Sequence, residues 1–442
     1  YEDGWGGVST EPPPAAWSGA VDALLGHRAT LVGCIDAVRA ASPDFVPARC
    51  VQGFGLLFKG RVELRARALR LAEEVAPLCR TAREQLLVAA IRAWANDDAF
   101  GALRALREIL ERHPTDALTI KVHHGLAFLY GDRVAMLGAL EGVATAWSDA
   151  TPGAGYVHGC HAFALCEDGQ FEQAEAVGRR AVELEPSDAW GIHAVSHSFE
   201  MRDRPEHAAQ WLDAQRAGYD GCSVFRGHVY WHRAMIDCEL GHPRDALAMY
   251  DAHVLRPWAG DYRDMSNCTT LLWRLESDGI DVGDRWVGLA EIAAAFGLDH
   301  GSAFADAHYA LALSRAGDPA PMRVSLAAHC AEEVAGAQRS VQREVGAPLI
   351  EAIGLGPSDP GRSFEALVRL QKTLVRIGGS DAQRDVFELL RLQAAIDSAR
   401  RTPETLQRAQ RALRQRRAER PGHRWAKQRI TLGTHHEAGV LA

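Results

Sequence analysis

The sequence predicts an all-α protein built from repeated helical hairpins, and three observations lead to this prediction. Apolar residues recur at spacings of three and four along nearly the whole chain, which is the period of an amphipathic helix. Alternating runs of β-branched residues bounded by turn residues are almost absent. From Arg83 onward, pairs of such helices recur about every 34 residues. Repetition at this length is typical of an array of stacked helix pairs.

The N-terminal part of the chain is expected to precede the repeats as a cap. Residues 1–20 are rich in Pro and Gly, which predicts an extended N-terminal segment, although helical spacing already begins at Trp17. Residues 21–82 contain two amphipathic stretches separated by Pro43 and Pro47, and we predict that they form an N-terminal helical cap.

Residues 83–260 contain the predicted repeats. The stretch GYVHGCHAFALCEDGQFEQAEAVGRRAVELEPSDAW has a helix, a break at Gly169, a second helix and a closing Pro186. Small residues at the helix crossings and a final Pro-x-Asp match the tetratricopeptide pattern. Residues 261–442 stay helical but irregular, and they end in an Arg-rich capping helix for which we expect a solvated outer face. We therefore predict a tetratricopeptide-like helical-hairpin solenoid that curls into a closed toroid.

The composition restricts the classes of partner. A net charge of −8 is mild for 442 residues and does not favour binding to nucleic acid. No apolar run reaches the roughly 18 residues that span a bilayer, so we expect no membrane partner. The nine cysteines are single residues without a CxxC spacing, which is typical of a reducing compartment and predicts a cytoplasmic protein. A homodimer is one state that the sequence allows.

Histidines at helical spacing lie in the middle of the repeats. His193 and His197 are four residues apart, and so are His228 and His232, so that each pair lies on one face of one helix. The first helix of each tetratricopeptide pair lines the inner groove, so we expect these four imidazoles to face one cavity and to act as catalytic residues. Candidates for substrate binding near them are Glu200, His158, His161 and Trp231.

These residues leave three functions open. An imidazole pKa of about 6.5 suits general acid/base catalysis on a small polar metabolite, as in a lyase, isomerase, cyclase or hydrolase. The same four histidines form a set that zinc or iron could occupy, but the chain has no HExxH motif, so no metal cofactor is favoured. The third function is a protein-interaction scaffold without catalysis, which is the usual role of tetratricopeptide arrays. We expect a small-molecule ligand in the central cavity, and most of the aromatic residues are expected to serve packing.

Several pieces of the chain, in order, resemble the tetratricopeptide repeat protein 38 family. They are AIRAWANDD, HPTDALTIKVHH, WGIHAVSHSFEM, VYWHRAMIDCELG, FADAHYALAL and IGGSDAQRDVF. The resemblance implies an all-α tetratricopeptide-like fold and no particular reaction. It adds one catalytic candidate, His124, and three substrate-binding candidates, Asp306, His308 and Arg384. This chain departs from the family pattern at His158 and His161, where family members carry apolar residues or Met.

Overall fold

The computed structural model describes residues 2–8, 13–255, 261–399 and 403–430. Over these residues the regular structure is helical, and the β contacts are two isolated bridges, Glu2 to Val8 and Arg28 to Cys222. The structure therefore confirms the all-α prediction.

The helices follow one another with short connections. The N-terminal half contains α1 (Trp17–Leu25), α2 (Leu31–Ala41), α3 (Val46–Leu57), α4 (Val62–Val75), α5 (Ala82–Ala95), α6 (Ala99–Arg112), α7 (Ala117–Leu129), α8 (Arg133–Val143), α9 (Ala154–Glu167), α10 (Phe171–Leu184), α11 (Ala189–Met201) and α12 (Pro205–Ala214). The C-terminal half contains α13 (Arg216–Tyr219), α14 (Val224–Leu240), α15 (Pro243–Met249), α16 (Tyr262–Ser277), α17 (Arg285–Phe296), α18 (Ala303–Ala316), α19 (Ala320–Ala331), α20 (Ala337–Val341), α21 (Ala347–Leu355), α22 (Pro360–Leu370), α23 (Asp381–Ala399) and α24 (Pro403–Glu419). Short 3-10 or π segments are η1 (Ala76–Leu78), η2 (Ala144–Ala146), η3 (Tyr250–Val254), η4 (Gln342–Gly346) and η5 (Leu374–Ile377).

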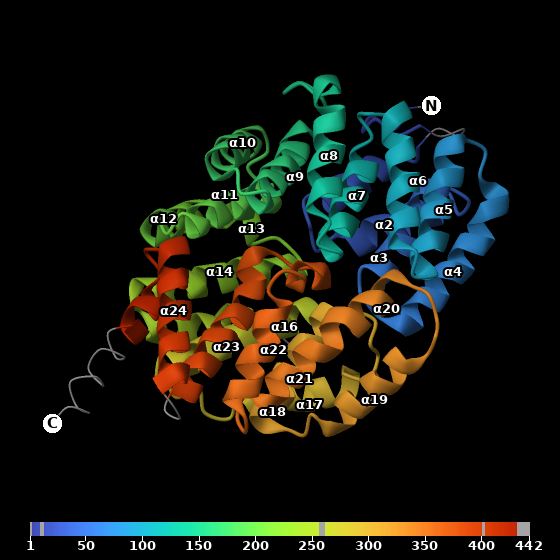
Figure 1. The fold of residues 1–442 in the computed structure, drawn as a ribbon. Helices are drawn as coiled ribbons and strands as arrows, with labels where there is room; N and C mark the ends of the chain where they lie inside the picture. Colours follow the sequence, from blue (N-terminus) through green and yellow to red (C-terminus); the bar gives the residue numbers. More distant parts are fainter. Residues whose placement is uncertain (1, 9–12, 256–260, 400–402, 431–442) are drawn as a thin grey trace.

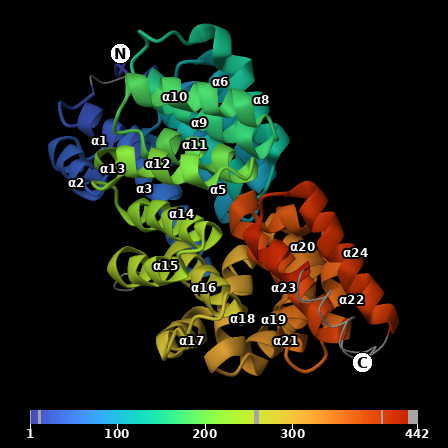
Figure 2. The ribbon, with the colours of Figure 1, turned by 90° about the vertical axis from the view of Figure 1, so that its left-hand side faces the viewer.

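The hairpin repeat is clearest from α9 to α12. Helix α9 packs on α10, and both pack on α11, the first helix of the next pair (Figure 2). Gly169 turns the chain between α9 and α10 with a φ of 84°, a conformation that favours glycine. A Cβ atom on Gly178 would lie 2.6 Å from Val195 Cγ2, so a small residue is needed where these helices cross. Helix pairs that each pack on the next pair are the arrangement of a tetratricopeptide-like solenoid, as predicted.

Helix α11 contributes to both halves of the core. One apolar cluster extends from Trp17 to Ala194 and fills the N-terminal half, whereas the other extends from Val182 to Ala426 and fills the C-terminal half. Trp190 and Ala194 belong to the first cluster, and Ile192 and Val195 of the same helix belong to the second. The face of α11 between these two sets of residues carries the histidines.

The array curves until residues far apart in the sequence meet (Figure 1). The carboxylate of Asp97, just before α6, accepts the backbone N–H groups of Gln338 and Arg339 in α20 at 3.1 and 3.2 Å. Arg133 at the start of α8 donates to the carboxylate of Asp381 at the start of α23. The array thus closes around the inner helices, which now face a common interior.

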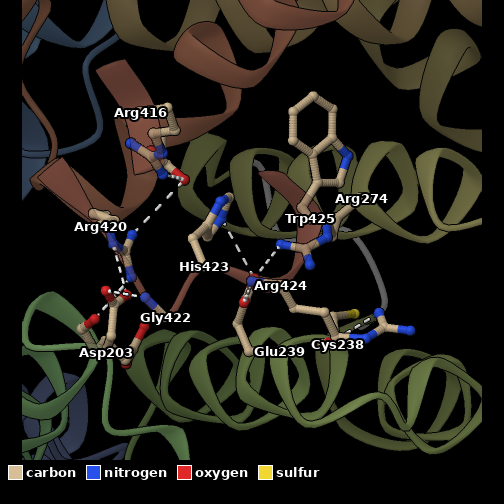
Figure 3. Close-up of polar contacts among 12 residues, drawn as sticks. Asp203, Cys238, Glu239, Arg274, Arg416, Arg420, Gly422, His423, Arg424 and Trp425 are labelled. Atoms are coloured by element: carbon tan, nitrogen blue, oxygen red, sulfur yellow. Dashed lines mark hydrogen bonds and ion pairs between the residues drawn. The ribbon is translucent and has the colours of Figure 1, made fainter. Parts of the chain in front are cut away.

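The end of the described chain holds the central helices together (Figure 3). Asp203, at the turn after α11, accepts the backbone N–H of Gly422 at 2.8 Å. Glu239 in α14 accepts the backbone N–H of Arg424 at 2.7 Å and pairs with Arg274 of α16, also at 2.7 Å. The segment after α24 therefore joins α11, α14 and α16.

The Arg-rich helix α24 is less exposed than its composition predicts. Arg416 is buried, and its guanidinium donates to both carboxylate oxygens of Asp385 in α23, at 2.6 and 2.8 Å. Arg408 follows the prediction, because its side chain is 50% exposed and pairs with an equally exposed Glu365. Burying a guanidinium is tolerable here because the carboxylate compensates its charge.

Every helix in the described ranges is too short or too polar to cross a bilayer. The division of the chain at residues 20, 82 and 260 stays a prediction. Residues 256–260, at the last of these boundaries, lie outside the described residues, and so do residues 431–442 of the predicted C-terminal part.

We expect the variant Glu239→Gln to be destabilised, because it removes the negative charge next to buried Arg274. Arg274 keeps Asp278 as a second partner at 3.2 Å, so the expected loss is about 2–3 kcal/mol in the free energy of unfolding at pH 7. Urea denaturation measures this loss. Burial raises the pKa of Glu239, but Arg274 and the Arg424 N–H outweigh burial and hold that pKa below its ordinary value. The difference between wild type and variant should therefore shrink as the pH falls below about 4.3.

The matched control is Glu365→Gln, which removes a carboxylate from the exposed pair with Arg408 and should change stability little. The role assigned to Glu239 would be wrong if the two variants unfolded at the same urea concentration.

Candidate functional site

Four histidine side chains from two neighbouring helices meet at one point. His193 and His197 project from α11, and His228 and His232 project from α14. The Nε2 atom of His193 lies 2.8 Å from that of His197, 3.0 Å from that of His228 and 3.1 Å from that of His232. One ring nitrogen of each residue lies within 4.8 Å of those of the other three, and all four residues are buried. We call these residues the four-histidine cluster.

The helices and the surrounding rings orient the cluster. The i, i+4 spacing places both rings of each pair on the helix face that meets the other helix. Phe163 of α9 stacks on His193 with ring centroids 5.4 Å apart, and Trp231 stacks on His228 at 5.2 Å. Phe225 packs edge-on to His193 at 5.1 Å. These ring contacts restrict the orientations of the imidazoles.

The outer ring nitrogens of the α14 pair are held by polar side chains. His228 Nδ1 lies 2.9 Å from the carbonyl oxygen Oδ1 of Asn267, and His232 Nδ1 lies 2.9 Å from Oε1 of Glu200. Ser196 Oγ donates to the same Glu200 oxygen at 2.9 Å. An oxygen acceptor at Nδ1 places the proton on Nδ1 and leaves Nε2 with a free lone pair. Both Nε2 atoms of this pair are therefore ready to act as ligands.

The imidazoles of the cluster are neutral at pH 7. Burial lowers the pKa of His232 to about 3 and places the pKa values of the other three well below the ordinary value. Burial also raises the pKa of Glu200 to about 7. A general acid or base works best with a pKa near the working pH, so these imidazoles suit the role of metal ligands better than that of proton shuttles.

Neutral imidazoles at these distances cannot satisfy all of one another's hydrogen-bonding nitrogens. The Nε2 atoms of His228 and His232 lie 3.2 Å apart, and each presents a lone pair. The Nδ1 atoms of His193 and His197 have no hydrogen-bond partner among the described residues. A cation at the centre would accept all four lone pairs. A tetrahedral ion with bonds of about 2.0–2.1 Å would place its nitrogens about 3.3–3.4 Å apart, close to the spacings observed.

A cavity of about 840 Å³ lies beside the cluster. His193 and His228 line it, whereas His197 and His232 are not among its lining residues. The other lining residues come from both halves of the chain, including α1, α2, α3, α4, α7, α16, α18 and the turn before α23, so the cavity occupies the centre of the closed array. The cluster forms part of the wall of this central cavity.

Two further histidines line the cavity next to Trp190. His124, which the family resemblance suggested, accepts the Trp190 indole N–H at 3.2 Å through Nε2. His27, in the turn after α1, stacks on Trp190 and Phe225 with ring centroids 5.4 and 4.8 Å apart. No sequence pattern points to His27, because it stands alone in a turn.

The other substrate-binding candidates from the first repeats lie behind the cluster or apart from it. Glu200 and Trp231 contact the cluster on the sides away from the cavity. His158 faces Asp149 at 3.4 Å near the outer side of α9, and neither His158 nor His161 lines the cavity. Asn267, which was not among the predicted site residues, contacts the cluster through His228. Its neighbours at helical spacing, Arg263, Asp264 and Thr270, are themselves polar, so no sequence pattern sets Asn267 apart.

The three substrate-binding candidates that the family resemblance added also lie outside the cavity lining. The Asp306 carboxylate accepts a hydrogen bond from the Gln342 side-chain amide at 2.6 Å. His308 Nδ1 donates to the Phe304 carbonyl at 2.7 Å. Arg384 donates to two backbone carbonyls in the turn before α23 and pairs with Asp381 at 2.6 Å. The bond of Asp306 joins α18 to η4, whereas these bonds of His308 and Arg384 stay within their own helix or the turn before it.

No protein-family model matches the chain. Among solved structures, a chain from the structure of Naa15/Naa10 bound to HypK-THB is 14% identical, with a TM-score of 0.27, over 95% of this chain and 66% of that one. The P58(IPK) TPR domain is 13% identical, with a TM-score of 0.23, over 80% of this chain and 98% of that one. This chain thus spans just under two thirds of the first of these structures. Similarity at this level carries no information about function.

We expect His308 to contribute to stability in a pH-dependent way without affecting the four-histidine cluster. Burial lowers the pKa of His308 to about 4. As the pH falls, His308 therefore takes up a proton in the unfolded chain before it does so in the folded chain. The contribution of neutral His308 to the free energy of unfolding is complete above pH 6.5 and is lost as the pH falls toward 4. The variant His308→Asn keeps an N–H donor for Phe304. Between pH 6.5 and 4.5, the free energy of unfolding of this variant should fall less steeply than that of wild type, by about 1.4 kcal/mol per pH unit.

Urea denaturation at each pH measures the two profiles, and the exposed His207, changed to Gln, serves as the control. Equal slopes for wild type and His308→Asn would contradict this prediction.

Proposed function

We propose that this protein binds one divalent transition-metal ion through His193, His197, His228 and His232. The observation that carries the proposal is the convergence of their four ring nitrogens within 4.8 Å of one another in a buried site. The donor set supports it, because all four imidazoles are neutral and two of them are held by an oxygen acceptor at Nδ1. An acceptor of this kind is typical of metal-bound histidine.

Zinc is the metal that best suits these ligands. Imidazole binds Zn²⁺, Cu²⁺, Ni²⁺ and Fe²⁺, and Zn²⁺ adopts a tetrahedral geometry without an electronic preference of its own. Two positive charges in a buried site need compensation. Glu200, whose carboxylate touches His232 and has a pKa of about 7, would lose its proton as the ion binds.

One side of the proposed ion would face the central cavity. His193 and His228 belong to the cavity wall, so a small molecule in the cavity would approach the ion between these two rings. The proposal therefore keeps a small-molecule ligand and gives the histidines the role of metal ligands in place of general acids and bases. Membership of the tetratricopeptide repeat protein 38 family and a cytoplasmic location remain proposals that rest on the sequence.

A protein-interaction scaffold is the second candidate function. Tetratricopeptide arrays commonly bind a segment of a partner protein on their inner surface. The central cavity here is lined by residues of the inner helices, many of them apolar. A scaffold of this kind would keep its partner when the four-histidine cluster is removed without unfolding the chain, whereas a metal-dependent function would be lost.

We expect the purified protein, dialysed against Zn²⁺ and then against buffer, to contain one equivalent of zinc by elemental mass spectrometry. The double variant His193→Ala, His228→Ala should contain none, because two ligands cannot hold the ion against dialysis. Glu200→Gln should weaken zinc binding about 10- to 100-fold, since it replaces the carboxylate behind His232 with a neutral amide.

The control is His161→Ala, which removes a histidine of the neighbouring helix α9 and should leave the zinc content unchanged. A wild-type zinc content no higher than that of the double variant would overturn the metal proposal. Circular dichroism on each variant shows whether the helical fold is intact.

A further inference from the structure

Lys121 places a positive charge on the cavity wall without an ion-pair partner. It projects from α7, is half-buried and lines the cavity beside Trp190. Its ammonium lies 5.0 Å from the centre of the Trp190 ring and 3.9 Å from the sulfur of Cys160. Lys121 takes part in none of the ion pairs formed among the described residues.

None of the described groups near Lys121 forms an ion pair with it. Burial raises the pKa of the Cys160 thiol to about 11, so the thiol is neutral at pH 7. Asp188 acts on Lys121 from farther away, but burial raises the pKa of its carboxyl to about 7, and the carboxylate already accepts the Gly191 N–H at 2.9 Å. The contrast is with Lys59, whose ammonium is 3.1 Å from Asp261.

The cavity lining has more cationic than anionic side chains, and three of the cations, Arg28, Lys59 and Arg263, pair with carboxylates just outside the lining. The lining includes seven Lys or Arg residues and two Asp or Glu residues, in a chain with a net charge of −8. Three of the cations, Arg39, Arg67 and Arg70, are exposed on α2 and α4, where the cavity reaches solvent. A cleft with apolar walls and cations of this kind attracts anions and raises their local concentration.

The wall next to Lys121 is flat, aromatic and neutral. Trp190, His27 and Phe225 stack with ring planes inclined by 20° and 26° to that of His27. Burial, followed by the charges of Lys121 and Arg263, lowers the pKa of His27 well below its ordinary value, so its ring is uncharged. This surface offers an apolar body a place to pack, with a cation at its edge.

We infer that the central cavity binds a monocarboxylic acid with an apolar body, its carboxylate paired with Lys121 and its body packed on Trp190, His27 and Phe225. The inference names the ligand class of the cavity beside the proposed metal site, and it rests on the proposed function only for the role of the ion. Arg384, a substrate-binding candidate from the family resemblance, does not take this role, because backbone carbonyls and Asp381 occupy its guanidinium.

The test is isothermal titration of the full-length protein with 4-phenylbutanoate and with its neutral counterpart, 4-phenylbutanamide. We expect wild type to bind the acid at least about tenfold more tightly than the amide, a ratio that corresponds to about 1.4 kcal/mol. Lys121→Met keeps an apolar chain of similar length, so it should reduce the affinity for the acid to that for the amide. Lys121→Arg should keep the preference for the acid. The matched control, Lys59→Met, leaves Asp261 paired with Arg263 and should also keep it.

Each titration is made on zinc-loaded and on metal-depleted samples whose zinc content has been measured. A preference for the acid in a protein that holds no zinc would leave this inference standing while the metal proposal fails. Stoichiometric zinc without a preference for the acid, or without binding of either compound, would overturn this inference alone. A preference that survives Lys121→Met would also overturn it. The difference between the affinities of wild type for the acid and for the amide tests the inference even if a variant does not fold.

Discussion

The contact between α11 and α14 is the constraint on which the rest of the site depends. It buries four imidazoles whose ring nitrogens point at one another, and a buried polar group destabilises a fold unless it is satisfied. Asn267 and Glu200 satisfy the outer nitrogens of His228 and His232, while the outer nitrogens of His193 and His197 have no partner among the described residues. This region is costly as a purely structural core, and a bound cation would remove much of the cost.

The closed array supplies the stability that such a site requires. The buried arginines of the described chain are paired, as in the contacts of Arg274 with Glu239 and of Arg416 with Asp385, so they hold helices together without leaving an uncompensated cation. Lys121 departs from this rule in the central cavity. An uncompensated cation at an internal surface indicates a place kept for an anion, in the same way that unsatisfied imidazoles indicate a place kept for a cation.

The two proposed sites share one geometric element. Trp190 contacts Lys121 on one side and packs against His193 at a ring distance of 5.2 Å on the other. A carboxylic acid held by Lys121 would therefore extend along the indole ring toward the histidine that lies at the centre of the cluster. The order of these residues along the cavity wall connects ligand recognition to the proposed metal ion.

The sequence alone determined the helical-hairpin fold and the pairing of His193 with His197 and of His228 with His232. These are properties of local spacing, because an amphipathic helix places residues four apart on the same face whatever its surroundings.

Tertiary structure decided which faces meet. Asn267, His27 and Lys121 join the site from other helices or turns, and no local pattern predicts contacts across them. Asp306, His308 and Arg384 belong to the family pattern, yet here they bond to protein groups outside the cavity lining. Similarity of sequence does not separate a residue that binds a ligand from one that holds the fold. Contacts such as that of Asp97 with α20 close the array and bring the inner helices around one cavity. The repeat pattern of the sequence suggests such a closure, but the packing of distant helices determines it.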